Sequence, residues 1–247
     1  MSRRAAAYPA LWLCGRLFAC GDHSPLSRSE FASVMSPYAP LPASVQRAVA
    51  MRTAALGSLM RLADASFPAT ARILDAGCGH GQMTRWLARG LGRAVVGIDS
   101  SEARIASARG SDMPANVQFQ CIAVGDYTAV SAEPWDGFVF ADTLLYLTPE
   151  AQRLALLATR DAAAPGAVMI LKDSITEHRW KFHATRLEER VKLRIGYYGN
   201  AARPSLTYRS RAEWTVLLAE TGWKVAEEHR TPRVLPYPGR VAVCHAV

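Results

Sequence analysis

One stretch, residues 73–81 with the sequence ILDAGCGHG, constrains the fold of this 247-residue chain more than any other feature. Two apolar residues lead into an acid, and three alternating glycines then open a segment, residues 82–89, with a helical pattern. Glycines at a strand-to-helix turn let the backbone turn tightly and approach a ligand closely. The unpaired N–H groups at the start of the helix favour polar or anionic ligand groups. The stretch predicts a nucleotide-type binding turn, although a tight turn without a ligand would use the same glycines.

A second acid follows at the expected distance. Residues 93–99, RAVVGID, form a short apolar run that ends in Asp99, which lies about 20 residues after Gly77. A carboxylate at this offset accepts hydrogen bonds from ribose hydroxyls in Rossmann-like units. The runs at 117–124 and 135–141 are also of strand type, and acids follow both, at Asp126 and Asp142.

The pattern D-x-G-x-G-x-G, together with these three acid-ended runs, resembles class I methyltransferases that use S-adenosylmethionine (SAM), and in particular those that act on small molecules. The resemblance covers residues 71–172 and implies SAM as the cofactor. Carried over to this sequence, it implies that Asp99 binds the ribose and that Asp126 binds the adenine amino group. The implied cofactor-binding residues are Asp75, Gly77, Cys78, Gly79, Gly81, Asp99, Ser100, Asp126, Tyr127 and Asp142.

The order of apolar patterns predicts an α/β fold, because strands that alternate with helices form a parallel sheet covered by helices. The resemblance implies a three-layer, Rossmann-like, seven-stranded and mostly parallel sheet with an antiparallel last hairpin. A helical N-terminal extension and a lid insertion between strands five and six complete the expected fold. The expected helices are 42–64, 82–90, 102–109, 149–162 and 211–221, and the expected strands are 72–76, 94–98, 117–123, 135–141, 167–172, 224–228 and 241–245.

Length and composition suit one methyltransferase domain, residues 35–247, after a poorly ordered or mis-started leader, residues 1–34. The leader begins with a charged and then apolar pattern, which leaves export as an alternative. Five scattered cysteines without metal-ligand spacing favour a reducing cytoplasm and predict no metal site. No apolar run is long enough to span a bilayer. The sequence leaves the oligomeric state open.

Positive charge is concentrated in one segment, residues 174–211, which contains nine Lys and Arg residues against three Glu, or +6 of the net +8. Ser174 and Glu177 have capping-box spacing, which predicts a helix start. On this helix, Trp180, Ala184, Leu187 and Val191 form an apolar stripe behind the capping box. Beside it lie Arg179, His183, Arg186 and Arg190, which form either a solvated face or an anion-binding face of the substrate lid.

The resemblance implies methyl transfer from SAM, and the localised positive charge favours a small, anionic acceptor, either a carboxylate or phenolate oxygen or an acyl group on a carrier protein. Arg179, Arg186 and Arg190 are the expected substrate contacts, and His183, then His178, are the candidate bases. Residues 141–144, ADTL, lack the proline-rich motif of amino-methylating DNA enzymes, so a nucleic-acid substrate is not expected. An RNA-binding methyltransferase and a non-catalytic SAM-fold partner protein remain the alternatives.

Overall fold

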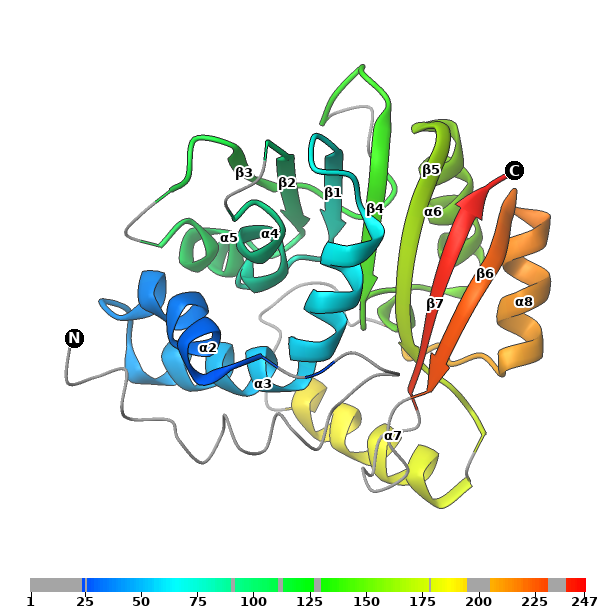
Figure 1. Cartoon of the computed structure of the whole chain (residues 1–247). Coiled ribbons are helices and arrows are strands. Elements are labelled where there is room, and N and C mark those ends of the chain that lie inside the picture. Colours follow the sequence, from blue (N-terminus) through cyan, green and yellow to red (C-terminus); the bar gives the residue numbers. More distant parts are fainter. Residues whose placement is uncertain are drawn as a thin grey trace.

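The computed structural model describes residues 24, 26–89, 92–110, 113–126, 130–177, 179–194, 205–230 and 239–247. Its centre is a seven-stranded sheet with the order β3-β2-β1-β4-β5-β7-β6 (Figure 1). The strands are β1 (Arg72–Ala76), β2 (Ala94–Asp99), β3 (Val117–Cys121), β4 (Trp135–Ala141), β5 (Ala163–Ser174), β6 (Trp223–Arg230) and β7 (Gly239–Ala246).

Strands β1 to β5 pair in parallel, whereas β7 lies antiparallel between β5 and β6. The expected mostly parallel sheet with an antiparallel last hairpin is therefore confirmed. Because the parallel strands share one direction, their carboxyl ends meet at a single edge of the sheet. β5 is longer than expected, since its first residues continue the pairing with Trp135 and its last residues pair with β7 up to Ser174.

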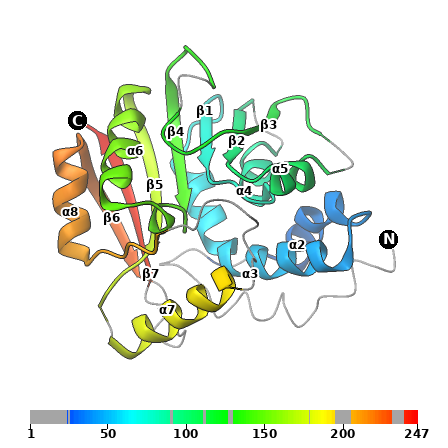
Figure 2. The same cartoon turned by 180° about the vertical axis from the view of Figure 1, so that it is seen from behind.

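Helices cover both faces of the sheet (Figures 1 and 2). They are α2 (Arg28–Met35), α3 (Ala43–Ser66), α4 (Gln82–Leu87), α5 (Glu102–Arg109), α6 (Pro149–Asp161), α7 (Arg179–Arg194) and α8 (Arg211–Glu220), with short 3-10 turns η3 (Ser36–Tyr38) and η5 (Leu144–Tyr146). The expected helices begin and end within a few residues of these bounds.

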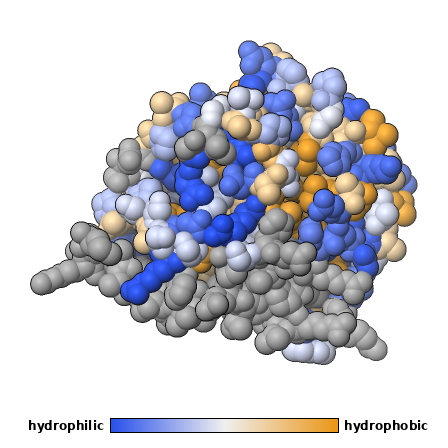
Figure 3. Space-filling view, viewed as in Figure 1, coloured by the Kyte–Doolittle hydropathy of each residue, from blue (hydrophilic) through white to orange (hydrophobic). Residues whose placement is uncertain are grey.

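Alternate residues of each strand belong to two separate hydrophobic clusters, as a pleated sheet requires. On one face, Ile73 and Val139 pack with residues of α2, α3, α4 and α5. On the other face, Leu74 and Phe138 pack with residues of α6 and α8. In the space-filling view, hydrophobic areas are concentrated over the half that holds β4 to β7 (Figure 3).

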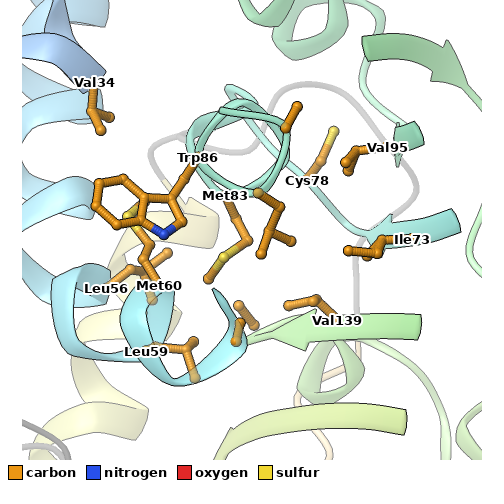
Figure 4. Close-up of a cluster of buried hydrophobic side chains, with 14 of the residues drawn as sticks. Val34, Leu56, Leu59, Met60, Ile73, Cys78, Met83, Trp86, Val95 and Val139 are labelled. Carbon is orange, nitrogen blue, oxygen red and sulfur yellow. The ribbon is translucent and has the colours of Figure 1, made fainter. Parts of the chain in front are cut away.

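The N-terminal part needs a correction. The expected leader boundary after residue 34 falls inside α2, whose capping box is formed by Ser27 and Glu30. Phe31 and Val34 of this helix are buried. Val34 lies in the same hydrophobic cluster as Trp86 of α4 and Met60 of α3 (Figure 4). This helix therefore belongs to the folded domain, while residues 1–23 lie outside the described residues.

The capping box expected at Ser174 is wrong, because Ser174 is the last residue of β5 and pairs with Gly239. Glu177 instead accepts a hydrogen bond from the backbone N–H of Arg211, at 2.7 Å. A bridge between Ile175 and Arg209 brings the two ends of the insertion together. From this base, α7 lies beyond the carboxyl ends of β4 and β5 (Figures 1 and 2).

Candidate active site

The glycine turn between β1 and α4 has three residues with positive φ, namely Gly77 (78°), Gly79 (58°) and Gly81 (80°). A Cβ on Gly77 would lie 2.4 Å from the side chain of Thr143, and one on Gly81 would lie 2.5 Å from the ring of Phe119. A Cβ on Gly79 would meet no atom of the described residues within 4 Å. The first and third glycines are thus required by packing, whereas Gly79 faces open space that a ligand can occupy.

Asp99 joins this turn to the end of β2. Its Oδ2 accepts a hydrogen bond from the N–H of Gly79 at 3.0 Å, and its Oδ1 accepts one from the N–H of Ser101 at 2.9 Å. Arg104 lies 3.7 Å from the same carboxylate. An ionised carboxylate has about four acceptor positions, so Asp99 can still accept hydrogen bonds from a diol.

Asp75 has a bracing role inside the turn. It is 2% exposed, and the hydroxyl of Thr84 on α4 donates a hydrogen bond to its Oδ2 at 2.6 Å. Burial raises the pKa of Asp75 to about 6, although the hydrogen bonds from Thr84 oppose this effect. This acid therefore fixes the first turn of α4 against β1, which the motif alone did not indicate.

Tyr38 and His80 form a second brace that sequence reasoning missed. The Tyr38 hydroxyl donates a hydrogen bond of 2.6 Å to the carbonyl of His80, and His80 Nδ1 lies 2.5 Å from the Ser107 hydroxyl. Burial, reinforced by the charge of Arg104, lowers the pKa of His80 to about 4. The imidazole is therefore neutral near pH 7. No local pattern could reveal this contact, because Tyr38 lies in a different part of the chain.

At the carboxyl ends of β4 and β5, Asp142 lies between two cations. Arg52 of α3 donates a hydrogen bond to its Oδ2 at 2.7 Å, and Lys172 pairs with both carboxylate oxygens. Burial alone would raise the pKa of Asp142, but Lys172 and Arg52 hold it below its ordinary value. Asp142 also has a φ of 55°, which is uncommon for a residue other than glycine. Two cations around one anion leave a local excess of positive charge.

Asp173 lies beside this cluster and has the opposite electrostatic environment. It is 3% exposed, its Oδ1 accepts a hydrogen bond from the N–H of Ser174, and its Oδ2 has no hydrogen-bond partner among the described residues. Burial and the nearby charge of Asp142 raise its pKa well above the ordinary value. Neighbouring acids with such different environments are typical of functional sites, although structural networks show them too.

The remaining expected cofactor contacts lie around the same edge. Asp126 is exposed, so its side chain is accessible to a ligand. The Ser100 carbonyl accepts a weak hydrogen bond from the Cys121 thiol at 3.6 Å, while the Cys78 thiol is buried. Tyr127 lies outside the described residues.

Hydrogen bonds tie the insertion to the turn that follows β4. The Tyr146 hydroxyl on η5 donates to Glu189 Oε2 on α7, at 2.8 Å. Nearby, the Thr207 N–H donates to the Leu145 carbonyl at 2.9 Å, and Gln152 donates to the Thr207 carbonyl at 3.2 Å. The insertion is therefore joined to the site at its base and along α7.

The apolar stripe of α7 faces outward. Lys181 and Thr185 are buried, whereas Trp180, Leu187 and Val191 are 67%, 64% and 47% exposed. The inner side of α7 includes Glu189, which accepts the hydrogen bond of the Tyr146 hydroxyl. The sequence pattern identified the stripe, but it could not say which side would be covered.

This orientation separates the expected substrate and base residues. Arg186 is half-buried on the flank of the inner side, while Arg190 and His183 are exposed. His183 lies about 200° around the helix axis from Lys181. His183 is therefore on the side of α7 opposite the buried Lys181, and its role as a base stays a prediction. His178 and the side chain of Arg179 lie outside the described part of the chain.

Comparison with known proteins agrees with this geometry. Residues 73–166 match the family model described as "Methyltransferase domain". A trans-aconitate 2-methyltransferase from Variovorax paradoxus (strain S110) is 34% identical over 114 residues, which are 45% of this chain and 41% of the relative. A carboxy-S-adenosyl-L-methionine synthase from Pseudomonas syringae pv. tomato (strain ATCC BAA-871 / DC3000) is 32% identical over 136 residues, 51% of this chain and 55% of the relative.

Among solved structures, the Burkholderia thailandensis 1,6-didemethyltoxoflavin-N1-methyltransferase with bound S-adenosylhomocysteine has the same fold. The TM-score is 0.61 at 18% identity, and the match covers 93% of this chain and 95% of that one. Residues 73–166 therefore belong to a methyltransferase domain, in a chain with the fold of a SAM-dependent methyltransferase. The matched segments span about half the length of the two curated relatives. No helix in the described part of the chain is long and apolar enough to cross a membrane.

Proposed function

We propose that this protein binds SAM at the carboxyl ends of β1 and β2 and transfers its methyl group to a small anionic acceptor. The observation that carries the proposal is the hydrogen bond from Gly79 N–H to Asp99, at 3.0 Å, beside the open space over Gly79. It combines a backbone turn that admits a ligand with a carboxylate that still has acceptor positions.

The residues of the turn fit this cofactor. Asp99 would accept hydrogen bonds from the ribose, and the exposed Asp126 would accept one from the adenine amino group. When bound, SAM supplies a methyl group that its sulfonium already activates. The protein therefore has mainly to hold the acceptor in line and exclude water. A carboxylate acceptor needs no base, because it is already ionised near pH 7.

The anionic acceptor is supported by the charges around the strand ends. Arg52 and Lys172 together exceed the single charge of Asp142, and the buried Lys181 belongs to the inner side of α7. A field of this sign attracts anions and speeds their capture. The relative named for trans-aconitate, which is itself a carboxylate, points in the same direction. The acceptor could be free or attached to a carrier protein.

Calorimetric titration with S-adenosylhomocysteine tests the cofactor site. Wild-type protein should bind, and Asp99→Asn should weaken binding roughly tenfold to a hundredfold, because it removes charge-assisted hydrogen bonds. Glu102→Gln is the matched control, since this carboxylate begins α5 three residues away and is exposed. Equal affinity in all three proteins would refute the ribose assignment, and no binding by folded wild-type protein would refute the proposal.

The acceptor is tested with a panel of carboxylates, phenols and amines and methyl-labelled SAM. Transfer to carboxylates should dominate, and Arg186→Gln should raise the KM of the acceptor more than that of SAM. Arg190→Gln is the control, because Arg190 lies one turn away on the exposed side. Binding of SAM without turnover on any acceptor would favour the non-catalytic alternative. Retention on RNA at low salt, lost at high salt, would favour the RNA-binding alternative.

A further inference from the structure

The outer side of α7 combines an exposed apolar stripe with exposed basic residues beside it. Trp180, Ala184, Leu187 and Val191 recur at i, i+4, i+7 and i+11 and are all exposed. Three of them rank among the largest exposed apolar side chains of the described residues. We call these four residues the outer stripe. Large apolar side chains gathered on one exposed surface indicate an interaction site.

A row of cations borders the outer stripe on one side. Arg190 and Arg194 form this row, and both are exposed and lie about 70° around the helix from the middle of the stripe. The whole of α7 contains six Lys and Arg residues and two Glu residues. The surface therefore offers a narrow apolar seam together with positive charge along one edge.

We propose that the outer stripe and its cation row form a docking surface for an amphipathic helix of an acidic partner protein. The spacing of the stripe is that of a coiled-coil seam, which accepts the apolar side chains of a second helix. Acidic side chains on one edge of the partner helix would pair with the cation row and steer the encounter.

The shape of the surface favours a helix over the other possible occupants. A helix that lies in a membrane interface needs a broad apolar face, whereas this stripe is only about 60° wide. A second copy of this chain would bring the same cations against one another, which costs free energy. The stripe extends over about three turns, so the contact should be weak and reversible.

A labelled synthetic peptide tests this surface with the full chain. The peptide carries leucines at i, i+4, i+7 and i+11 and glutamates along one edge, and binding is followed by fluorescence anisotropy. Leu187→Gln and Arg190→Glu should each weaken binding at least fivefold, and raised salt should weaken it further. Leu154→Gln is the matched control, because Leu154 is 54% exposed on α6.

Three outcomes would overturn the proposal. The first is equal binding of a peptide in which the same leucines are dispersed around the helix. The second is tighter binding to phosphatidylglycerol vesicles than to the peptide, lost in Leu187→Gln. The third is a dimer in sedimentation that this variant abolishes. Titration of the same variants with S-adenosylhomocysteine distinguishes this proposal from the proposed function. Their affinity for S-adenosylhomocysteine should equal that of the wild-type protein, whatever their affinity for the peptide.

Discussion

The glycine turn and helix α7 lie at the same edge of the sheet, but they are built in different ways. In the turn, packing, backbone conformation and hydrogen bonds agree, since Gly77 and Gly81 leave no room for a Cβ and Asp99 holds the backbone of Gly79. In α7, hydrophobicity and burial disagree, since Lys181 is buried and Leu187 is exposed.

This difference shows what each region is suited to do. A turn in which packing, backbone conformation and hydrogen bonds all favour the same structure has one conformation, as a preorganised cofactor site requires. A helix that buries polar groups and exposes apolar ones is unfavourable unless each side meets a ligand or partner. The comparison therefore supports a fixed cofactor side and an acceptor side open to interaction.

The largest expected effect concerns the ion cluster of Arg52, Asp142 and Lys172 at the carboxyl ends of β4 and β5. Asp142→Ala should lower the free energy of unfolding by about 3 to 5 kcal/mol, because it leaves Arg52 and Lys172 without their shared anion. Urea unfolding measures this loss. Glu133→Ala is the control, since Glu133 pairs with Arg72 at the surface and should contribute less than about 1 kcal/mol. Similar losses in both variants would show that the cluster is no more than a surface pair.

The glycines give the next largest effect. Gly77→Ala should destabilise by about 2 to 4 kcal/mol, because an unfavourable φ combines with a clash against Thr143. Gly79→Ala has the same conformational penalty without a clash, so it should cost about 1 to 2 kcal/mol. It should nevertheless weaken S-adenosylhomocysteine binding. Full affinity in Gly79→Ala would contradict the view that the cofactor lies over this glycine.

A pH dependence distinguishes the buried acid of the turn. The pKa of Asp75 is raised to about 6, so the folded state holds its proton more tightly than the unfolded chain does. Asp75 therefore contributes to the free energy of unfolding at low pH, and this contribution is lost as the pH rises from about 4 to about 6. Across this range, the free energy of unfolding of the wild-type protein should fall by roughly 1 to 3 kcal/mol relative to that of Asp75→Asn.

The lowered pKa of His80 acts in the opposite direction, since its contribution grows as the pH rises from about 4 to its ordinary 6.5. It is present in both proteins, so it cancels in the difference between their unfolding free energies. A difference that stays constant from pH 4 to pH 7 would contradict the raised pKa of Asp75.

The smallest effect tests α7 itself. Leu187→Gln should change stability by no more than about 0.5 kcal/mol, because this leucine is 64% exposed. Leu156→Ala on α6 is the positive control, since Leu156 is fully buried and its truncation should cost about 2 to 5 kcal/mol. A large loss in Leu187→Gln would mean that the outer stripe is covered within this chain.

Much of the fold could be predicted from the sequence, because its signals are local. The bounds of β1, β4 and α5 matched the apolar patterns, and the glycine turn followed from residues that lie next to one another. The helix start expected at Ser174 failed for the same reason. A capping-box spacing is a local pattern, and pairing with β7 across the sheet overrode it.

The order of the strands and helices and the acids at the strand ends could be predicted from local patterns, since periodicity and turn chemistry act over a few residues. Local patterns could not predict that Arg52 meets Asp142, that Tyr38 contacts His80, or that Leu187 faces outward. These outcomes depend on contacts between distant segments. An amphipathic helix has two sides, and only its neighbours decide which of them becomes buried.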